Sequence, residues 1–448
     1  MRCIKWIFAI LFADSFSKIH CVGIKSNILG PFLPNKPFSV TWDVASEKCE
    51  EKYGISLYLD HFGIRHNTKN GWKGNVISIF YENDLGLFPH FNDSGQPING
   101  GLPQEIPLFA HLDKVKKDVY RVLPDLDFEG LAVIDWRSWL PLWDQICHDN
   151  MHMHIYRDKS IQKVKAEHPD WQQSKIISQT KSEYESGAKT LMKFTLRLTK
   201  KLRPKAKWGF YLYPDCYNYD SDGHKIDLRC TNYTKNQDDK LQWLFNESTA
   251  LYPSAYLTKW FKHNLTALYF VAYRVLEAVR VDSNRPEDTS IPIFLYHSVA
   301  YPDTKKFLNL FDLRDTIGVA SLLGASGVVI WGGYDIANTA EECQNLGNYI
   351  SSILGPFVQF ISDAASKCSH ERCNNHERCV LSHFPGYKDN LNERTHLEVQ
   401  EVAKTMSTLN EDFSETFNLS LQKPGHYPHY IVCQCYEKWT GYFCNEMH

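Results

Sequence analysis

The sequence has almost no net charge. Its 448 residues include 49 Lys and Arg against 52 Asp and Glu, so the formal net charge is −3 and the pI is about 6.7. Because no field of one sign surrounds the chain, its composition gives no reason to expect nucleic acid or an anionic membrane as a partner. Any affinity for a polyanion must come from a local patch.

Long apolar runs are missing after the first residues, and none approaches the roughly 20 residues that cross a bilayer. Arg2 and Lys5 precede a short apolar stretch at residues 6–13. This pattern is typical of a secretory signal peptide; the alternative, an N-terminal anchor, is disfavoured by the short length. We predict a signal peptide at about residues 1–21 and a secreted, extracellular protein without a membrane anchor.

No Gly-rich phosphate loop follows the first β-rich segment, which disfavours a doubly wound nucleotide-binding sheet. Instead, apolar β-rich segments alternate with amphipathic ones, an order that predicts a parallel α/β fold, best as a closed barrel. The strand candidates are residues 38–44, 75–81, 130–136, 207–214, 292–298 and 326–333. The helix candidates are residues 182–202, 265–281 and 311–323.

Cysteine, in contrast, is plentiful, with 13 residues in the chain. Cys3 and Cys21 fall in the signal segment, so about eleven remain in what we expect to be an oxidising compartment. Export also makes the glycosylation sequons plausible surface sites. These sequons are at Asn92, Asn232, Asn246, Asn264 and Asn418.

Six of the cysteines lie from Cys368 onward, and the segment 433–444 (CQCYEKWTGYFC) resembles an EGF-like module. A small unit of this kind needs bridges to fold. We place a barrel at residues 22–365 and a small disulfide-rich EGF-like module at 366–448, with a long insertion and no calcium site. The resemblance implies the pairs Cys368–Cys379, Cys373–Cys433 and Cys435–Cys444.

In an α/β barrel, functional side chains lie at the C-terminal ends of the strands. Those ends carry Asp135, Tyr211 and Trp331, and Tyr252 follows in the segment 250–254 (ALYPS). An acid among aromatic rings suits a carbohydrate, because rings stack on sugar faces while the carboxylate orders polar groups. The aromatic residues could equally well belong to the barrel core.

Together these segments resemble the hyaluronidase family over nearly the whole mature chain, most specifically in NGGLPQ (99–104) and LAVIDW (131–136). The resemblance implies a distorted TIM-like (β/α) barrel that hydrolyses β-1,4 N-acetylhexosaminide bonds inside hyaluronan or chondroitin. A glutamic acid protonates the glycosidic oxygen, and the substrate's acetamido group replaces a protein nucleophile. It further implies that Asp135 orients that acetamido group and that Tyr211, Tyr252 and Trp331 line the cleft, with bridges Cys49–Cys343 and Cys216–Cys230.

The chain departs from the family at the proton donor, where Arg137 replaces glutamate, and Leu140 replaces a nearby arginine. A guanidinium supplies no useful acid near neutral pH, and loss of a general acid typically costs about 10²–10⁴ in rate. We expect Arg137 to keep Asp135 ionised. Glu129 and Asp144 lack the donor's spacing. Two hypotheses remain: a hydrolase with impaired catalysis, or an inactive protein that binds hyaluronan and possibly chondroitin.

Weaker patterns have ordinary interpretations. The basic run of residues 197–207 is best read as a solvated helix end, although a polyanion site is possible. His148, His152 and His154 lack the further ligands of a metal site, and we expect neither metal nor cofactor. Cys147 is left over from the five pairs; it could pair with another chain, but we expect it to be buried. A monomer is the default.

Overall fold

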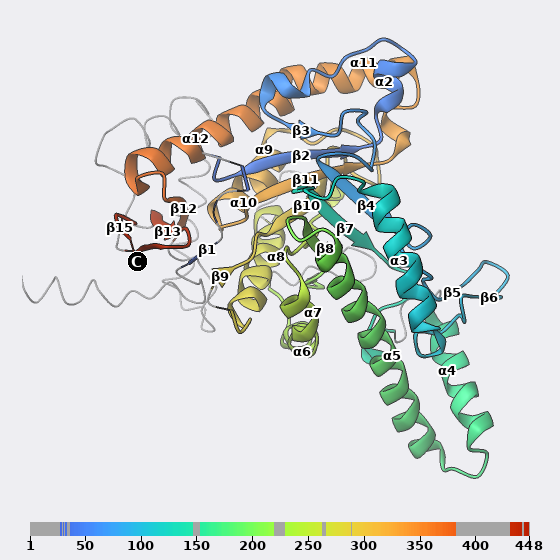
Figure 1. Ribbon diagram of the computed structural model, residues 1–448. Coiled ribbons are helices and arrows are strands. Elements are labelled where there is room, and N and C mark those ends of the chain that lie inside the picture. Colours follow the sequence, from blue (N-terminus) through green and yellow to red (C-terminus); the bar gives the residue numbers. More distant parts are fainter. Residues whose placement is uncertain are drawn as a thin grey trace, which may run out of the picture.

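The computed structural model describes residues 27–28, 30, 32–33, 36–146, 153–218, 229–261, 266–287, 289–381, 431–440 and 443–447. Strands alternate with helices along most of this length (Figure 1). Within these residues, no helix is both long and apolar enough to cross a membrane. The predicted signal segment, Cys3, Cys21, Cys147, His148, His152, Asn264, Asn418 and most of the insertion lie outside the described residues.

The main strands are parallel and form two sheets with the orders β10-β11-β2-β3 and β4-β7-β8. Their bounds are β2 Ser39–Val44, β3 Arg65–His66, β4 Ile77–Tyr81, β7 Leu131–Asp135, β8 Lys207–Phe210, β10 Phe294–Ser298 and β11 Gly327–Gly332. The segment 251–254 links the sheets through single parallel bridges to Tyr211 on one side and to Ile293 and Tyr296 on the other. The strands therefore form one curved row, as in a barrel.

The row of strands curves enough to bring the end of β11 into contact with the end of β4, which lies in the other sheet. Trp331 at the end of β11 donates a hydrogen bond to the Tyr81 hydroxyl at the end of β4, at 3.4 Å. Trp72, in the connection between β3 and β4, donates to the carbonyl of Gly332 at 3.2 Å. The C-terminal ends of the strands thus surround one common space.

Alternation along each strand divides the side chains between two cores. One set points into the interior of the row and forms a small core of its own: Ile77, Ile79, Leu131, Val133, Ala250, Tyr252, Phe294, Tyr296 and Val329. The neighbouring positions, such as Ala132 and Ile134 on β7, pack in a larger core that includes the surrounding helices. Burial on both faces explains why these strands are apolar almost throughout.

The helices surround the strands, and α4 and α5 form a long hairpin that projects away from them (Figure 1). The bounds are α2 Glu47–Glu51, α3 Leu108–Val122, α4 His154–Glu167, α5 Gln173–Leu202, α6 Asn232–Lys240, α7 Gln242–Glu247, α8 Thr266–Ser283, α9 Leu310–Leu313, α10 Val319–Leu322, α11 Ala340–Tyr349 and α12 Gly355–Cys373. Turns of π-helix, Arg314–Gly318 and Ile350–Leu354, join α9 to α10 and α11 to α12.

Short strands complete the chain. β12 (Glu377–Leu381) pairs antiparallel with β13 (Ile431–Cys435), and β14 (Trp439–Thr440) with β15 (Glu446–Met447). β1 (Asn27–Ile28) runs parallel to β9 (Thr289–Ser290), and β5 (His90–Phe91) pairs with β6 (Pro97–Ile98). The helix α12 passes through residues 365 and 366, where the sequence analysis placed a domain boundary, and packs on β12.

The described part of the chain contains five disulfides, and their pairs are those that the two resemblances imply: Cys49–Cys343, Cys216–Cys230, Cys368–Cys379, Cys373–Cys433 and Cys435–Cys444. The first joins α2 to α11 across 294 residues of sequence. The second closes the loop after β8. Of the described sequons, Asn232 is exposed at the start of α6, whereas Asn92 and Asn246 are half-buried.

The basic run at residues 197–207 is partly neutralised by carboxylates. Arg197 and Lys200 pair with Glu247, and Lys205 pairs with Asp127 and Glu129. Arg203 differs from the expected solvated side chain, because it is fully buried and its guanidinium donates to the carbonyl of Leu123. These contacts reduce the positive charge that the run offers to a polyanion.

Candidate functional site

A cavity of about 200 Å³ opens at the C-terminal ends of the strands. It is lined by Ile79, Val133, Asp135, Arg137, Tyr211, Tyr256, Tyr296 and Trp331. These residues come from β4, β7, β10 and β11 and from the segments that follow β7, β8 and Ser254. The structure therefore brings together four of the residues that the sequence analysis selected: Asp135, Arg137, Tyr211 and Trp331.

Tyr252 is not among the lining residues, although the resemblance places it in the cleft. It is fully buried, and its ring packs near Phe294 and Tyr296, with centroids 6.0 Å away in both cases. Its hydroxyl donates to the carbonyl of Lys207, at the start of β8. The side chain thus points into the interior core and away from the strand ends, so the core interpretation of this aromatic residue holds.

Tyr256, Tyr296 and Tyr81 were missed by the sequence analysis. Tyr296 lies on β10 and packs edge-to-face on Tyr211, with ring centroids 5.1 Å apart. Tyr256 lines the cavity beside Trp331, and Tyr81 accepts the hydrogen bond from Trp331. Two of them were findable, because Tyr81 ends one predicted strand and Tyr296 lies near the end of another.

Asp135 and Arg137 form an ion pair in which Arg137 Nε lies 2.7 Å from Asp135 Oδ1. The Asp135 side chain is 8% exposed and that of Arg137 is 56% exposed, so the carboxylate lies deep and the guanidinium toward solvent. The Arg137 guanidinium also lies 5.5 Å from the centroid of the Tyr211 ring, within the range of a cation–π contact.

The pair changes the protonation of both groups. Burial raises the pKa of Asp135 to about 6, an effect that the Arg137 cation opposes and Glu82 reinforces. Burial acts to lower the pKa of Arg137, but the Asp135 carboxylate and nearby tyrosines outweigh it and the pKa is raised. As expected, the Arg137 cation lowers the pKa of Asp135, but desolvation raises it by more, so the carboxyl titrates near pH 6 and is ionised above that pH.

Glu82, just after β4, fixes the loop that carries Arg137. Its Oε1 accepts hydrogen bonds from the backbone N–H groups of Arg137 and Ser138, at 3.0 and 2.7 Å. Its Oε2 accepts from the Ser138 hydroxyl at 2.6 Å. The rings of Trp136 and Trp139 pack on Phe88, with centroids 4.9 and 5.1 Å away, so this loop is held from two sides.

A second acid lies deeper. Asp43, on β2, is fully buried, and its Oδ2 accepts a hydrogen bond from the Tyr296 hydroxyl at 3.4 Å. Burial raises the pKa of Asp43 well above its ordinary value, which favours the neutral form of the carboxyl. It is not among the residues that line the cavity.

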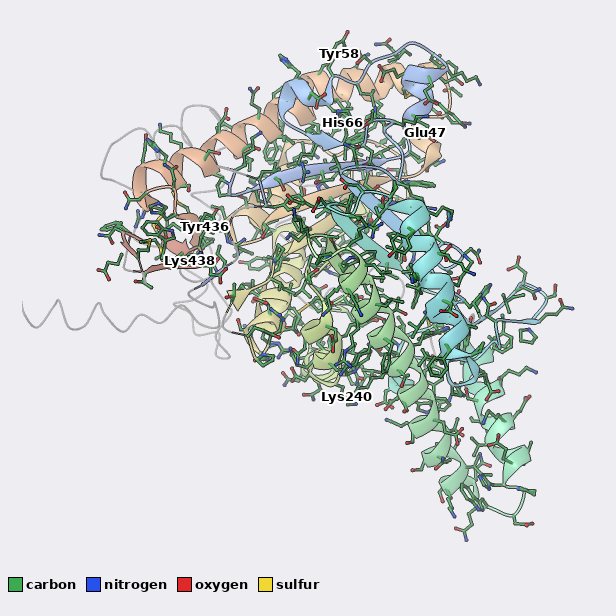
Figure 2. All side chains as sticks on the ribbon, viewed as in Figure 1. Glu47, Tyr58, His66, Lys240, Tyr436 and Lys438 are labelled. Carbon is green, nitrogen blue, oxygen red and sulfur yellow. A yellow bond between two sulfur atoms is a disulfide. The ribbon has the colours of Figure 1, made fainter. Side chains whose placement is uncertain are left out.

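The two acids considered as replacements for the missing donor lie elsewhere. Glu129 precedes β7, at the end of the strand opposite Asp135, and pairs with Lys205 at 3.3 Å. Asp144 pairs with Lys181 at 2.9 Å and with Lys240 at 3.2 Å. Lys240 ends α6 at the outer edge of the helical layer (Figure 2). Neither carboxylate lines the cavity.

Two groups of residues in the described part of the chain have ligand atoms close enough for a metal ion: Cys373, Glu377 and Cys433, and Glu377, Cys435 and Cys444. All four cysteines are in disulfides, and a disulfide sulfur is not a thiolate ligand. His154, at the start of α4, is in neither group.

Comparisons with known proteins place this chain among similar sequences and one similar fold. The sequence model of a family described as hyaluronidase matches residues 27–448. A hyaluronidase from Echis ocellatus is 36% identical, with 99% of this chain and 97% of that protein covered; hyaluronidase-2 from Bitis arietans is 35% identical with the same coverage. A crystal structure of bee venom hyaluronidase in complex with a hyaluronic acid tetramer matches with a TM-score of 0.65 and 32% identity, covering 72% of this chain and 99% of that one.

Proposed function

Because the chain belongs to the hyaluronidase family, we propose that it is a secreted protein that binds hyaluronan in this cavity and hydrolyses it slowly or not at all. The observation that carries the proposal is the ion pair between Arg137 and Asp135, 2.7 Å apart. Arg137 stands at the position where the family mechanism needs a carboxylic acid.

The pair affects two steps of the family reaction. The glycosidic oxygen needs a proton as the bond breaks, and a guanidinium with a raised pKa retains its protons. The acetamido group of the substrate needs a carboxylate to orient it, and Asp135 is already paired with Arg137. Losing the acid alone typically lowers the rate by about 10²–10⁴.

Retained binding is supported by the rest of the cavity. Tyr211, Tyr256, Tyr296 and Trp331 provide aromatic surface beside a carboxylate, which suits a sugar ring and its polar substituents. The similar bee venom enzyme has been crystallised with a hyaluronic acid tetramer. Hyaluronan is therefore the proposed ligand, and chondroitin, which has the same alternation of uronic acid and N-acetylhexosamine, is a further one.

The finer domain assignment is also a proposal. We assign residues 22–365 to a TIM-like barrel and 366–448 to an EGF-like module, with the continuous helix α12 spanning the boundary. The parallel row of strands supports the first part, and the three bridges of the C-terminal region support the second. The glycosylation sites and the monomeric state remain predictions from the sequence.

The test is degradation of high-molecular-weight hyaluronan and chondroitin by the purified secreted protein, followed by product size from acidic to neutral pH. The wild type is compared with Arg137→Glu and with Arg137→Glu combined with Leu140→Arg. We expect little or no cleavage by the wild type and a gain of about 10²-fold or more in the variants, because the acid is restored. Rapid cleavage by the wild type contradicts the proposal.

Arg121→Glu is the matched control. Arg121 is 58% exposed and pairs with Asp118 at 3.2 Å, much as Arg137 pairs with Asp135, but it lies near the end of the outer helix α3. The same charge reversal there is expected to leave hyaluronan cleavage at the wild-type level. A gain with this control assigns the effect to overall charge and not to position 137.

A further inference from the structure

We propose that Arg137 makes the cavity a receptor for the acidic group of its sugar ligand, a uronic acid carboxylate or a sulfate ester. The inference rests on the proposed function, because it concerns the same cavity. It gives the arginine a role in recognition in place of the family's proton transfer. The alternative is that Arg137 only fills the position and neutralises Asp135.

The first argument is the depth of the two charged groups. Asp135 is 8% exposed and Arg137 is 56% exposed, so a ligand entering the cavity meets the guanidinium before the carboxylate. The cavity measures about 200 Å³, below the roughly 300–1,000 Å³ typical of sites for larger ligands. A sugar unit that enters it must therefore lie close to Arg137.

The second argument is the orientation of the guanidinium. Its Nε lies 2.7 Å from Asp135 Oδ1 in the ion pair, and its Cζ lies 5.5 Å from the centroid of the Tyr211 ring. Among the described residues, neither Nη atom forms a hydrogen bond, and the nitrogen given for the ion pair with Asp135 is Nε. The edge formed by the two Nη atoms is therefore available. A planar fork of this kind matches two oxygens of a carboxylate or sulfate.

The third argument is the rigidity of the support. Glu82 holds the backbone N–H of Arg137 at 3.0 Å, so the side chain starts from a fixed point. Its far end is held by the Asp135 carboxylate and by the face of Tyr211. A long side chain fixed at both ends loses less rotamer freedom when it binds an anion than a free one does.

The fourth argument is the sign of the local charge. The other described residues that line the cavity are Asp135, two aliphatic residues, three tyrosines and one tryptophan, so Arg137 is the cation of this lining. With Arg137, the pair is neutral and can accept an anion. Without it, the cavity has no cation to attract an anion, and burial favours the neutral form of Asp135 still more. The residue at position 137 thus sets whether the cavity attracts an anion.

Isothermal titration tests the inference with defined hexasaccharides as probes. These are hyaluronan, the same hyaluronan with its uronic acids reduced to glucose, and chondroitin with and without 4-sulfate. The proteins are the wild type, Arg137→Gln, Arg137→Lys as a variant that keeps the charge without the fork, and Arg121→Gln as the exposed control.

We expect the wild type to bind hyaluronan about 10- to 100-fold more tightly than the reduced sugar, as for a hydrogen-bonded charged pair. Arg137→Gln should lose this preference, Arg137→Lys should keep part of it, and Arg121→Gln should keep all of it. A preference that follows carboxyl reduction identifies the carboxylate as the partner. A preference that follows 4-sulfation identifies the sulfate.

Equal binding of acidic and reduced sugars by the wild type overturns the inference and leaves the proposed function standing. A preference that Arg137→Gln retains also overturns it, because another group then supplies the recognition. If the wild type binds none of the sugars, the proposed function fails together with the inference.

Discussion

Glu82 accepts hydrogen bonds from Ser138 through both of its carboxylate oxygens, from the backbone N–H at 2.7 Å and from the hydroxyl at 2.6 Å. This contact ties the end of β4 to the loop after β7. The same carboxylate accepts the N–H of Arg137 at 3.0 Å. The ion pair in the cavity therefore depends on a residue 55 positions earlier in the chain, which does not itself line the cavity.

Replacing Glu82 should loosen this loop. In Glu82→Ala, three donors lose their acceptor, and we expect hyaluronan binding to weaken by about 10-fold. Hydrogen exchange should become faster at the amides of Arg137 and Ser138 and stay unchanged in β10. Glu82→Gln keeps one acceptor oxygen and should give an intermediate effect. Unchanged affinity and exchange in Glu82→Ala would show that the loop is held by its packing alone.

Substitution should distinguish the aromatic residues of the cavity, which affect hyaluronan affinity, from those of the core, which affect stability. Tyr211→Leu and Trp331→Leu remove surface from the cavity lining, and each should weaken hyaluronan binding by about 10-fold, with Phe109→Leu on exposed α3 as the control. Tyr252→Phe removes the hydrogen bond to Lys207. It should lower the free energy of unfolding by about 1 kcal/mol and leave affinity unchanged. A loss of affinity in Tyr252→Phe would place this residue in the binding site.

Binding of an anionic sugar should depend on the protonation of Asp135, whose pKa burial raises to about 6. Above that pH the carboxylate is charged and competes for Arg137; below it, the carboxyl is neutral, so affinity should rise as pH falls through about 6. A uronic acid carboxylate is at least as acidic as an ordinary side-chain carboxyl and stays charged over this range. The other groups that act electrostatically on Asp135 or respond to it are Glu82, Asp43, Tyr81, Tyr211 and Tyr256.

The measurement is the dissociation constant of a hyaluronan hexasaccharide at several pH values on both sides of 6, for the wild type and for Asp135→Asn. The wild type should bind several-fold more tightly on the acidic side. Asp135→Asn cannot titrate, and its affinity should be nearly flat. If both proteins show the same pH dependence, the titrating group is not Asp135.

Much of the fold follows from the sequence, because buried parallel strands are apolar on both faces. The segments 75–81 and 326–333 became β4 and β11 with bounds shifted by one or two residues. The helix α4 was not predicted, since polar residues occupy most of its surface and no apolar period marks it. Its position is fixed by packing on α5.

The sequence predicted which residues lie at the strand ends, but not how deeply each side chain is buried. Strand ends located Asp135, Tyr211 and Trp331 correctly near one space. Tyr252 forms a parallel bridge with Tyr211, yet its side chain points into the core, where its hydroxyl donates to the carbonyl of Lys207. Likewise, the pKa of Asp135 depends on how deeply the side chain is buried, which residue spacing does not show. The identity of a residue at a strand end is readable from sequence, but the direction of its side chain is not.

Acid should destabilise the fold through His111, on α3. The ring is fully buried; its Nδ1 accepts from the N–H of Leu87 at 3.0 Å and its Nε2 lies 2.8 Å from the Thr195 hydroxyl. Burial lowers its pKa to about 4, against about 6.5 in the unfolded chain. Because the unfolded state binds more protons between these values, the free energy of unfolding falls as pH drops from 6.5 to 4, by up to about 3 kcal/mol from this group.

Urea unfolding from pH 7 to pH 4 checks this. His111→Gln is expected to be less stable at pH 7 and to lose less stability on acidification than the wild type. His168→Gln, a half-exposed residue that stacks on Trp171 where α4 ends, is the control and should follow the wild type. Parallel stability curves for the wild type and His111→Gln would assign the acid sensitivity to other groups, such as the buried His297.

The central claim is that the cavity still binds hyaluronan although its catalytic acid is gone. The most direct test is a single incubation of the wild-type protein with an end-labelled hyaluronan hexasaccharide, in which bound ligand is measured at equilibrium and the ligand is then recovered and sized. We predict saturable one-to-one binding with the hexasaccharide recovered intact. Recovery of shorter sugars at a rate close to that of Arg137→Glu, or an absence of saturable binding, would contradict the account.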